Sequence, residues 1–205
     1  MRAIRWIKPM LPLTPVSWHG AGLILSPGAA RKLGRKEMQN YESAGWRCRY
    51  RLAKYREDMG MFKGDAEQFQ RVFRPYEVVE GEGNCLLNSG IDEIWDLICG
   101  GSAGHFDGAG AQIGVGDSAA AAEVTQTDLQ AAANKTYKGM DSGYPVSTNR
   151  KAAFKASFGE NDANYAWNEW VVKQSASGKC LNRKADCLGT KSGGTWVIQV
   201  EITLA

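Results

Sequence analysis

Hydrophobic and polar positions alternate most regularly at the C-terminal end of the chain. Apolar side chains occupy every second position of residues 195–204, and most positions between them are polar: Trp196, Ile198, Val200, Ile202 and Leu204. This period of two predicts a strand of an antiparallel sheet with one buried face. Residues 165–172 are rich in aromatic and β-branched side chains, which favours a second strand. Glycine-containing breaks at 175–178 and 191–194 separate the strands, so the region predicts a β-sandwich or a barrel.

Weaker patterns extend this expectation over residues 76–205. Short apolar or alternating runs predict further strands at 76–80, 111–116, 135–140 and 152–158. A helix is predicted over 90–99, where four apolar side chains recur at helical spacing: Ile91, Ile94, Trp95 and Ile98. The intervening residues 119–133 predict a surface loop or a short helix. We therefore expect residues 76–205 to form an antiparallel β-sandwich with one short helix.

The first thirty residues carry a different pattern. Prolines at positions 9, 12, 15 and 27 preclude a long helix, yet the segment is rich in large apolar side chains. Because such side chains are costly to leave in water, we expect an extended arm that lies along another surface, of its own domain or of a neighbour. The arm residues predicted to form this interface are Trp6, Leu11, Leu13, Trp18, Leu23 and Ile24.

Residues 29–58 predict an interrupted helical segment in which Gly45 separates two helices. The second predicted helix, over 46–59, carries three arginines that we assign to the same interface: Arg47, Arg49 and Arg51. Aromatic residues interleave with them, a composition that also occurs at nucleic-acid sites. No helix-turn-helix or other known module surrounds these residues. Nucleic acid is therefore the weaker alternative to a solvated helix that packs its aromatic side chains inward.

Charge divides the chain near residue 75. The net charge is +3, but residues 1–75 carry 15 Lys and Arg against 6 Asp and Glu, whereas residues 76–205 carry 10 against 16. The predicted organisation is an extended basic arm with one or two helices over 1–75, followed by the β-sandwich over 76–205. Such an asymmetry favours docking on a negative surface, for example a capsid floor, a neighbouring subunit or nucleic acid.

Targeting and redox signals are weak. No apolar run reaches the roughly 18 residues of a membrane-spanning helix, and prolines interrupt the apolar stretch behind the first basic residues, which argues against a signal peptide. Five scattered cysteines without a C-x-x-C pair predict neither a disulfide framework nor a zinc site. Reduced, mostly buried thiols suit assembly in a cytosol.

No pattern predicts catalysis, a cofactor or a metal. The glycines at 108, 110 and 114 lack the spacing of a dinucleotide-binding loop and precede a predicted strand. The two histidines, His19 and His105, do not suggest a catalytic pair, and Glu169 lacks an evident catalytic partner. Four aspartates lack the order of a calcium loop and are typical of turns: Asp117, Asp128, Asp141 and Asp162. We expect a protein that is not an enzyme.

Seven short segments follow one another in a recognisable order: 86–95 (LLNSGIDEIW), 113–118 (IGVGDS), 125–130 (TQTDLQ), 137–145 (YKGMDSGYP), 166–170 (AWNEW), 181–184 (LNRK) and 188–191 (LGTK). In this order they resemble a family of tailed-bacteriophage virion proteins. A looser pattern, vGD…TQT.L followed by W.E, is similar to the N-terminal domains of phage tail-collar fibres. The resemblance starts at about residue 84, and residues 1–75 carry no such segment.

This resemblance implies a structural, non-enzymatic virion protein, assembled in the host cytoplasm and homo-oligomeric. Its partners would be other virion proteins, either the major capsid protein or tail and neck proteins. A capsid decoration or cement protein that docks through its N-terminal arm is the favoured interpretation, and a tail or fibre-attachment protein is the alternative. A third hypothesis is a receptor- or glycan-binding module that uses aromatic side chains such as Tyr144 or Trp170.

Overall fold

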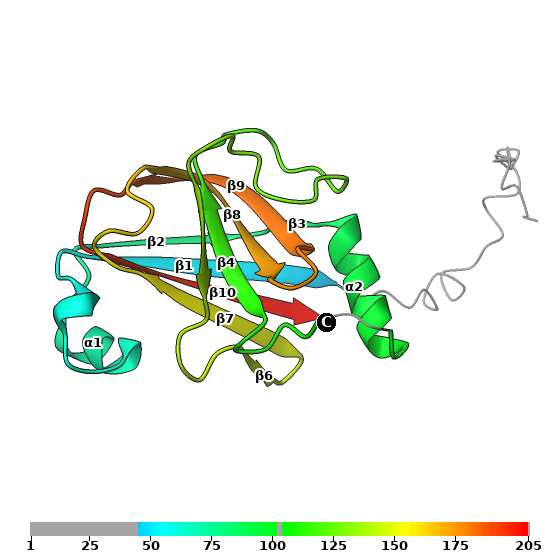
Figure 1. Cartoon of the computed structure of the whole chain (residues 1–205), viewed down its shortest axis with the longest axis horizontal. Coiled ribbons are helices and arrows are strands. Elements are labelled where there is room, and N and C mark those ends of the chain that lie inside the picture. The colour runs from blue at the N-terminus through cyan, green and yellow to red at the C-terminus, as the bar shows by residue number, and fades with distance from the viewer. Residues whose placement is uncertain (1–44, 102–103, 205) are drawn as a thin grey trace, which may run out of the picture. The chain divides into compact units, whose positions relative to one another are not determined.

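The computed structural model describes residues 45–101 and 104–204, and this part of the chain is mainly β (Figure 1). Its strands are β1 (Trp46–Tyr55), β2 (Glu77–Glu82), β3 (Cys85–Leu86), β4 (Ala111–Gly116), β5 (Lys135–Gly139), β6 (Val146–Thr148), β7 (Lys151–Phe158), β8 (Ala166–Gln174), β9 (Cys180–Thr190) and β10 (Thr195–Leu204). The helices are a 3₁₀ turn η2 (Met59–Met61), α1 (Ala66–Val72) and α2 (Asn88–Ile98). None of the helices in these ranges combines the length and the apolar character needed to cross a bilayer.

The strands form two antiparallel five-stranded sheets. Sheet A has the order β2-β1-β10-β7-β6, and sheet B has the order β3-β9-β8-β4-β5. One hydrophobic core takes side chains from both sheets, including Tyr50 and Ile198 from sheet A and Ile113 and Trp170 from sheet B. The alternation predicted for 195–204 is confirmed, because its apolar positions from Trp196 to Ile202 are buried in this core.

The helix predicted over 46–59 is wrong. Residues 46–55 form β1, which pairs with β10 on one side and with β2 on the other. The inward positions of β1 hold Trp46, Cys48, Tyr50 and Leu52, and they alternate with outward arginines. β1 is a central strand of sheet A, so residues 46–55, which were predicted to belong to the basic arm, pair with β2 and β10 of the region predicted as the β-sandwich. The other predicted N-terminal helix, over 29–41, lies outside the described residues.

The elements predicted from the sequence over residues 76–204 agree better with the structure than the helix predicted over 46–59. Strands form at each predicted position, and α2 occupies the predicted helix, although there are nine strands from β2 to β10 rather than about six. The apolar face of α2 is only partly packed: Ile94 lies against the main core, whereas its neighbours on that face are more exposed. Gly90 and Glu93 are its buried residues, whereas Trp95 is 59% exposed and Ile98 is 67% exposed.

The outer faces of the two sheets are covered unequally. The loop 117–134 folds over sheet B, where Leu129 packs with Val171 and Cys180 in a second apolar cluster. Helix α1 covers one end of sheet A through Phe69, which packs on Tyr55 and Val197. The two helices lie at opposite ends of the sheet pair (Figure 1). The rest of the outer face of sheet A is left to polar side chains.

Candidate functional site

The open face of sheet A is defined here by outward side chains from four adjacent strands: Arg47, Arg49 and Arg51 of β1, Glu80 and Glu82 of β2, Gln199 and Glu201 of β10, and Lys151 of β7. Strand register aligns these side chains in rows. Arg49 lies opposite Glu82 on one side and Glu201 on the other, while Arg51 lies between Glu80 and Gln199. Directly opposed residues of opposite charge attract one another, so the rows stabilise the pairing of β1 with its neighbours.

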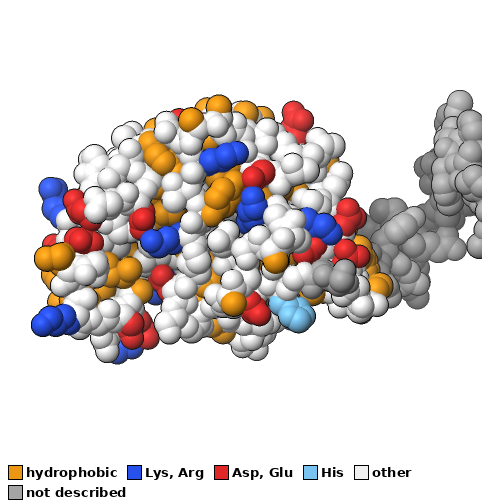
Figure 2. All heavy atoms as spheres, in the orientation of Figure 1, with side chains coloured by type: hydrophobic (Ala, Val, Ile, Leu, Met, Phe, Trp, Pro, Cys, Tyr) orange, Lys and Arg blue, Asp and Glu red, His pale blue; other side chains and the backbone are white. Residues whose placement is uncertain are grey.

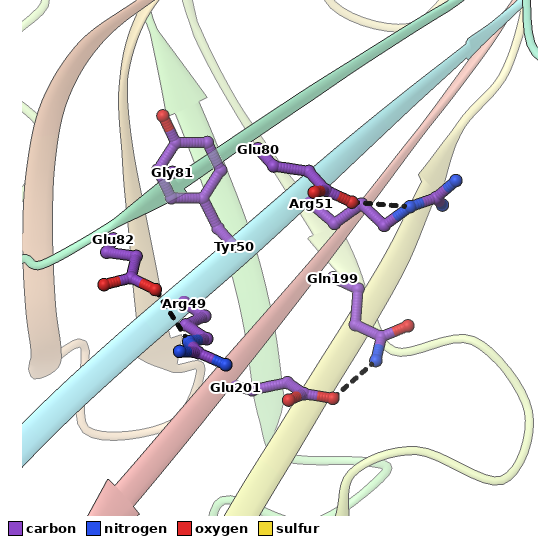
Figure 3. A pocket seen from close by; sticks show the side chains of 8 residues that line it. All are labelled: Arg49, Tyr50, Arg51, Glu80, Gly81, Glu82, Gln199 and Glu201. Carbon is purple, nitrogen blue, oxygen red and sulfur yellow. Dashed lines mark hydrogen bonds and ion pairs between the residues drawn. The ribbon is translucent and has the colours of Figure 1, made fainter.

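Each charged row contains an ion pair (Figure 3). Arg49 Nε lies 2.8 Å from Glu82 Oε1, and Arg51 Nε lies 3.3 Å from Glu80 Oε1. The Gln199 side-chain amide donates to Glu201 at 3.1 Å. These groups line a hollow of about 500 Å³, and an adjoining hollow of about 540 Å³ shares Arg49, Glu82 and Glu201 with it. The open face is therefore a broad charged surface without a deep cleft.

The structure brings the three predicted arginines together but separates them from their aromatic neighbours. Arg47, Arg49 and Arg51 point outward, whereas Trp46 and Tyr50 pack against or within the core. A surface that alternates stacking rings with cations, as single-stranded nucleic acid requires, is not formed by these residues. On the face of the molecule drawn in Figure 2, acidic and basic side chains are interspersed. The six arm residues predicted for the same interface, from Trp6 to Ile24, lie outside the described residues.

A buried ion pair that the sequence did not reveal organises the covering loop of sheet B. Glu169 and Arg183 both have fully buried side chains, and Arg183 Nε lies 2.7 Å from Glu169 Oε2. The backbone N–H groups of Gln130 and Ala131 donate to the Glu169 carboxylate at 2.9 and 2.7 Å. Arg183 also donates to the loop: to the carbonyl oxygens of residues 120 and 121 and to the side chain of residue 126. Apart from each other, Glu169 and Arg183 bond to groups of residues 120–131, all of which belong to the loop 117–134. The ion pair therefore fixes this loop over sheet B.

The aspartates considered for calcium are also occupied by the protein itself. Asp117 accepts from Asn134, Asp141 accepts from Ser157, and Asp162 accepts from Lys138. Within residues 45–101 and 104–204, no group of three His, Cys, Asp or Glu side chains is arranged to hold a metal ion.

The two buried cysteines do not provide an activated nucleophile. All five are free; Cys48 and Cys180 are buried, Cys85 is half-buried, and Cys99 and Cys187 are exposed. Two exposed thiols make the expectation of mostly buried cysteines only partly correct. Burial raises the pKa of Cys48 and of Cys180 to about 12, which keeps both protonated near neutral pH.

Asp128 provides a pH-dependent contact on the outer side of sheet B. Its carboxylate accepts from Tyr137 at 2.6 Å and from Lys173 at 2.9 Å. Burial alone would raise the pKa of Asp128, but the hydrogen bonds from Lys173, Tyr137 and the Leu129 N–H outweigh it and hold the pKa below 3.8.

Replacing Asp128 by Asn is expected to cost about 1–3 kcal/mol of unfolding free energy near neutral pH, because a charged acceptor of two side-chain hydrogen bonds is lost. A lowered folded-state pKa stabilises the fold above the unfolded value of 3.8, and this contribution disappears as the pH falls through the folded-state pKa. Urea unfolding of both proteins between about pH 7 and pH 2.5 measures the difference. A difference that stays constant over that range would contradict the assignment.

Comparisons with family models, curated proteins and solved structures find no match to this chain. The seven segments that carry the resemblance all lie in α2, in sheet B or in the loops that adjoin it. They include Glu169, Arg183 and Gln126, which together fix the covering loop. The open face of sheet A contains none of them.

Proposed function

We propose that this protein is a non-enzymatic structural component of a tailed-phage virion, with an antiparallel β-sandwich domain and an N-terminal arm. The favoured role is capsid decoration, and a tail or fibre-attachment protein is the alternative. One observation carries the proposal. Glu169 and Arg183, two charged residues within the segments that resemble the virion family, form a buried ion pair that holds a loop. Groups used in this way support a scaffold rather than a reaction.

Docking is assigned to the open face of sheet A together with residues 1–30. The face presents exposed charges, and an exposed ion pair contributes only about 0–1 kcal/mol to folding, so its side chains can be re-paired with a partner at little cost. Charge rows of both signs favour a protein partner with complementary rows over a polyanion. The partners would be the major capsid protein or tail and neck proteins, with further copies of this chain, inside a virion assembled in the host cytoplasm.

Removal of residues 1–30 is expected to reduce the copies per purified particle to below about a tenth, a change that corresponds to at least about 1.4 kcal/mol of binding free energy. Reversing charge on the open face with Arg49→Glu and Arg51→Glu should reduce incorporation in the same direction without unfolding the domain. Quantitative mass spectrometry of purified particles measures the copies.

The matched control is Arg71→Glu, because Arg71 is an exposed arginine of α1 that lies away from the open face. Its incorporation should equal that of the unmodified chain. Normal copy numbers for both the deletion and the double charge reversal would refute the docking assignment. In the unmodified particle, hundreds of copies would indicate the capsid, whereas a small multiple of three or six would indicate the tail or neck.

A further inference from the structure

Helix α2 exposes an apolar stripe to solvent. Ile91, Trp95 and Ile98 follow one another at helical spacing, and the last two are more than half exposed, at 59% and 67%. Val124 lies beside the start of the helix, because its carbonyl oxygen accepts from the Asn88 N–H at 2.9 Å, and its side chain is 50% exposed. Clustered exposed apolar side chains of this kind are typical of interaction sites.

We propose that this stripe binds residues 1–30 of a second copy of the chain. The inference deepens the proposed function and rests on its assignment of residues 1–30 to docking, because a segment bound to its own domain would fasten the protein to nothing. It also names a second docking surface. α2 packs on β9 of sheet B, where Ser89 donates to the Cys180 carbonyl oxygen, so the stripe is distinct from the open face of sheet A.

The charge beside the stripe favours a basic partner. α2 carries three acidic residues and no basic one: Asp92, Glu93 and Asp96. Asp92 and Asp96 are exposed and four residues apart, so they form an acidic row along one side of the stripe. Glu93 is buried and shares the ammonium of Lys179 with Asp96, at 2.8 and 3.3 Å. One ammonium against three carboxylates leaves this surface negative, which favours a partner that combines apolar with basic side chains.

Residues 1–30 have that composition. They contain three basic residues, Arg2, Arg5 and Lys8, and no Asp or Glu. They are also rich in large apolar side chains, among them Trp6 and Leu11. The segment therefore offers apolar groups for the stripe and positive charge for the acidic row beside it.

Other surfaces and other occupants fit less well. The open face of sheet A presents polar side chains with both signs of charge, which do not match an apolar segment. Val72 is an exposed apolar residue of α1, but it lies between Arg71 and Arg74 in the sequence, where a basic segment would meet like charge. Pairing of two α2 helices would bring two acidic rows together. Trp170, considered for glycan binding from the sequence, is fully buried in the core and offers no ring to any partner.

The first test is the self-association of the full chain, measured by sedimentation velocity between about 1 and 100 µM. The unmodified chain should form oligomers in this range. Two variants should each weaken self-association at least about tenfold: a helix variant, Trp95→Lys with Ile98→Lys, and an arm variant, Trp6→Glu with Leu11→Glu. An unmodified chain that stays monomeric up to about 100 µM would overturn the inference.

The matched control is Met61→Lys with Val72→Lys. Both side chains are exposed and apolar, but they lie near α1, at the end of the sheet pair opposite α2 (Figure 1). This control should associate like the unmodified chain. The helix and control variants replace exposed side chains, so thermal unfolding should show an intact fold in both.

A charge variant leaves the apolar stripe in place. Asp92→Lys should weaken self-association, because it puts positive charge beside the binding site of a basic segment. Raising NaCl from about 50 to 500 mM should weaken association of the unmodified chain in the same direction. Association that responds to neither change would contradict the role of the acidic row and overturn the inference.

The sharpest measurement is made on an equal mixture of the helix and arm variants. The helix variant retains an intact arm, and the arm variant retains an intact α2, so the mixture should form a one-to-one complex although neither protein associates alone. Pairing of α2 with α2 would leave the arm variant associated, and binding of each arm to its own domain would leave every chain monomeric. Either result would overturn the inference.

The same variants separate this inference from the proposed function. If the mixture stays monomeric while the arm variant is lost from purified particles, the arm binds another virion protein, so the inference fails and the proposed function stands. A one-to-one complex together with normal copies of the arm variant per particle would support the stripe as the docking site and count against the proposed docking role.

Discussion

Replacement of Arg183 by methionine is expected to destabilise the protein by about 3–5 kcal/mol, the cost typical of breaking a buried ion pair by removing one partner. Methionine fills much of the same space, so the loss would come from charge and hydrogen bonding rather than from a cavity. Glu169 would remain buried with only the two backbone N–H groups of the loop as partners. The side-chain contacts from sheet B to residues 120, 121 and 126 would also disappear.

Urea unfolding measures the loss, and limited proteolysis tests its location, because cleavage should begin within the loop 117–134. Arg71→Met is the control, since the Arg71–Glu67 pair is exposed on α1 and such i,i+4 pairs contribute about 0.3–0.5 kcal/mol. In the Arg183→Met background, Glu169→Gln should cost less than it does in the unmodified protein, or even restore stability, because the neutral side chain no longer needs a cation. A loss for Arg183→Met as small as that of the control would contradict the structural role assigned to this pair.

Replacement of Gly90 by alanine is expected to cost about 3 kcal/mol, the upper end of the range for overpacking. Helix propensity alone predicts the opposite sign, since alanine is favoured over glycine in a helix by about 1 kcal/mol. The conflict arises because a Cβ at position 90 would lie 2.3 Å from the Leu181 carbonyl oxygen and 2.7 Å from the Leu181 Cα. Both atoms belong to the backbone of β9, so no flexible side chain can move aside.

The control for this prediction is Asp92→Ala, an exposed position of the same helix, where a change within about 0.5 kcal/mol is expected. Thermal unfolding of both variants decides the result. If Gly90→Ala were neutral or stabilising, α2 would have to pack against β9 less closely than described. The exposed Trp95 fluorescence provides a second readout, because displacement of α2 would alter it.

The strands of the β-domain were predicted best from the sequence where one face of the strand is buried and the other is exposed to solvent. The alternation in β10 and the composition of β8 are direct consequences of that environment. In β1 the same alternation exists, with Cys48, Tyr50 and Leu52 between the arginines, but the absence of proline from residues 46–59 led to the prediction of a helix. The period of two was the better signal, because outward arginines on a strand need only opposed carboxylates, which β2 and β10 supply.

Contacts across strands were beyond the reach of sequence spacing. Glu169 and Arg183 lie on β8 and β9, whose pairing contains two register irregularities. Counting residues outward from the turn between these strands therefore does not predict that the two side chains meet.

The pairing of β1 with β10 has a consequence for synthesis of the chain. The first described strand, β1, finds one of its two neighbours only in β10, so sheet A cannot be completed until β10 has been synthesised. Until then, one edge of an alternating apolar strand is unprotected, and such edges recruit other chains. A nascent chain of this protein would therefore depend on rapid synthesis of the strands between β1 and β10, or on a chaperone, to keep the edge of β1 for β10.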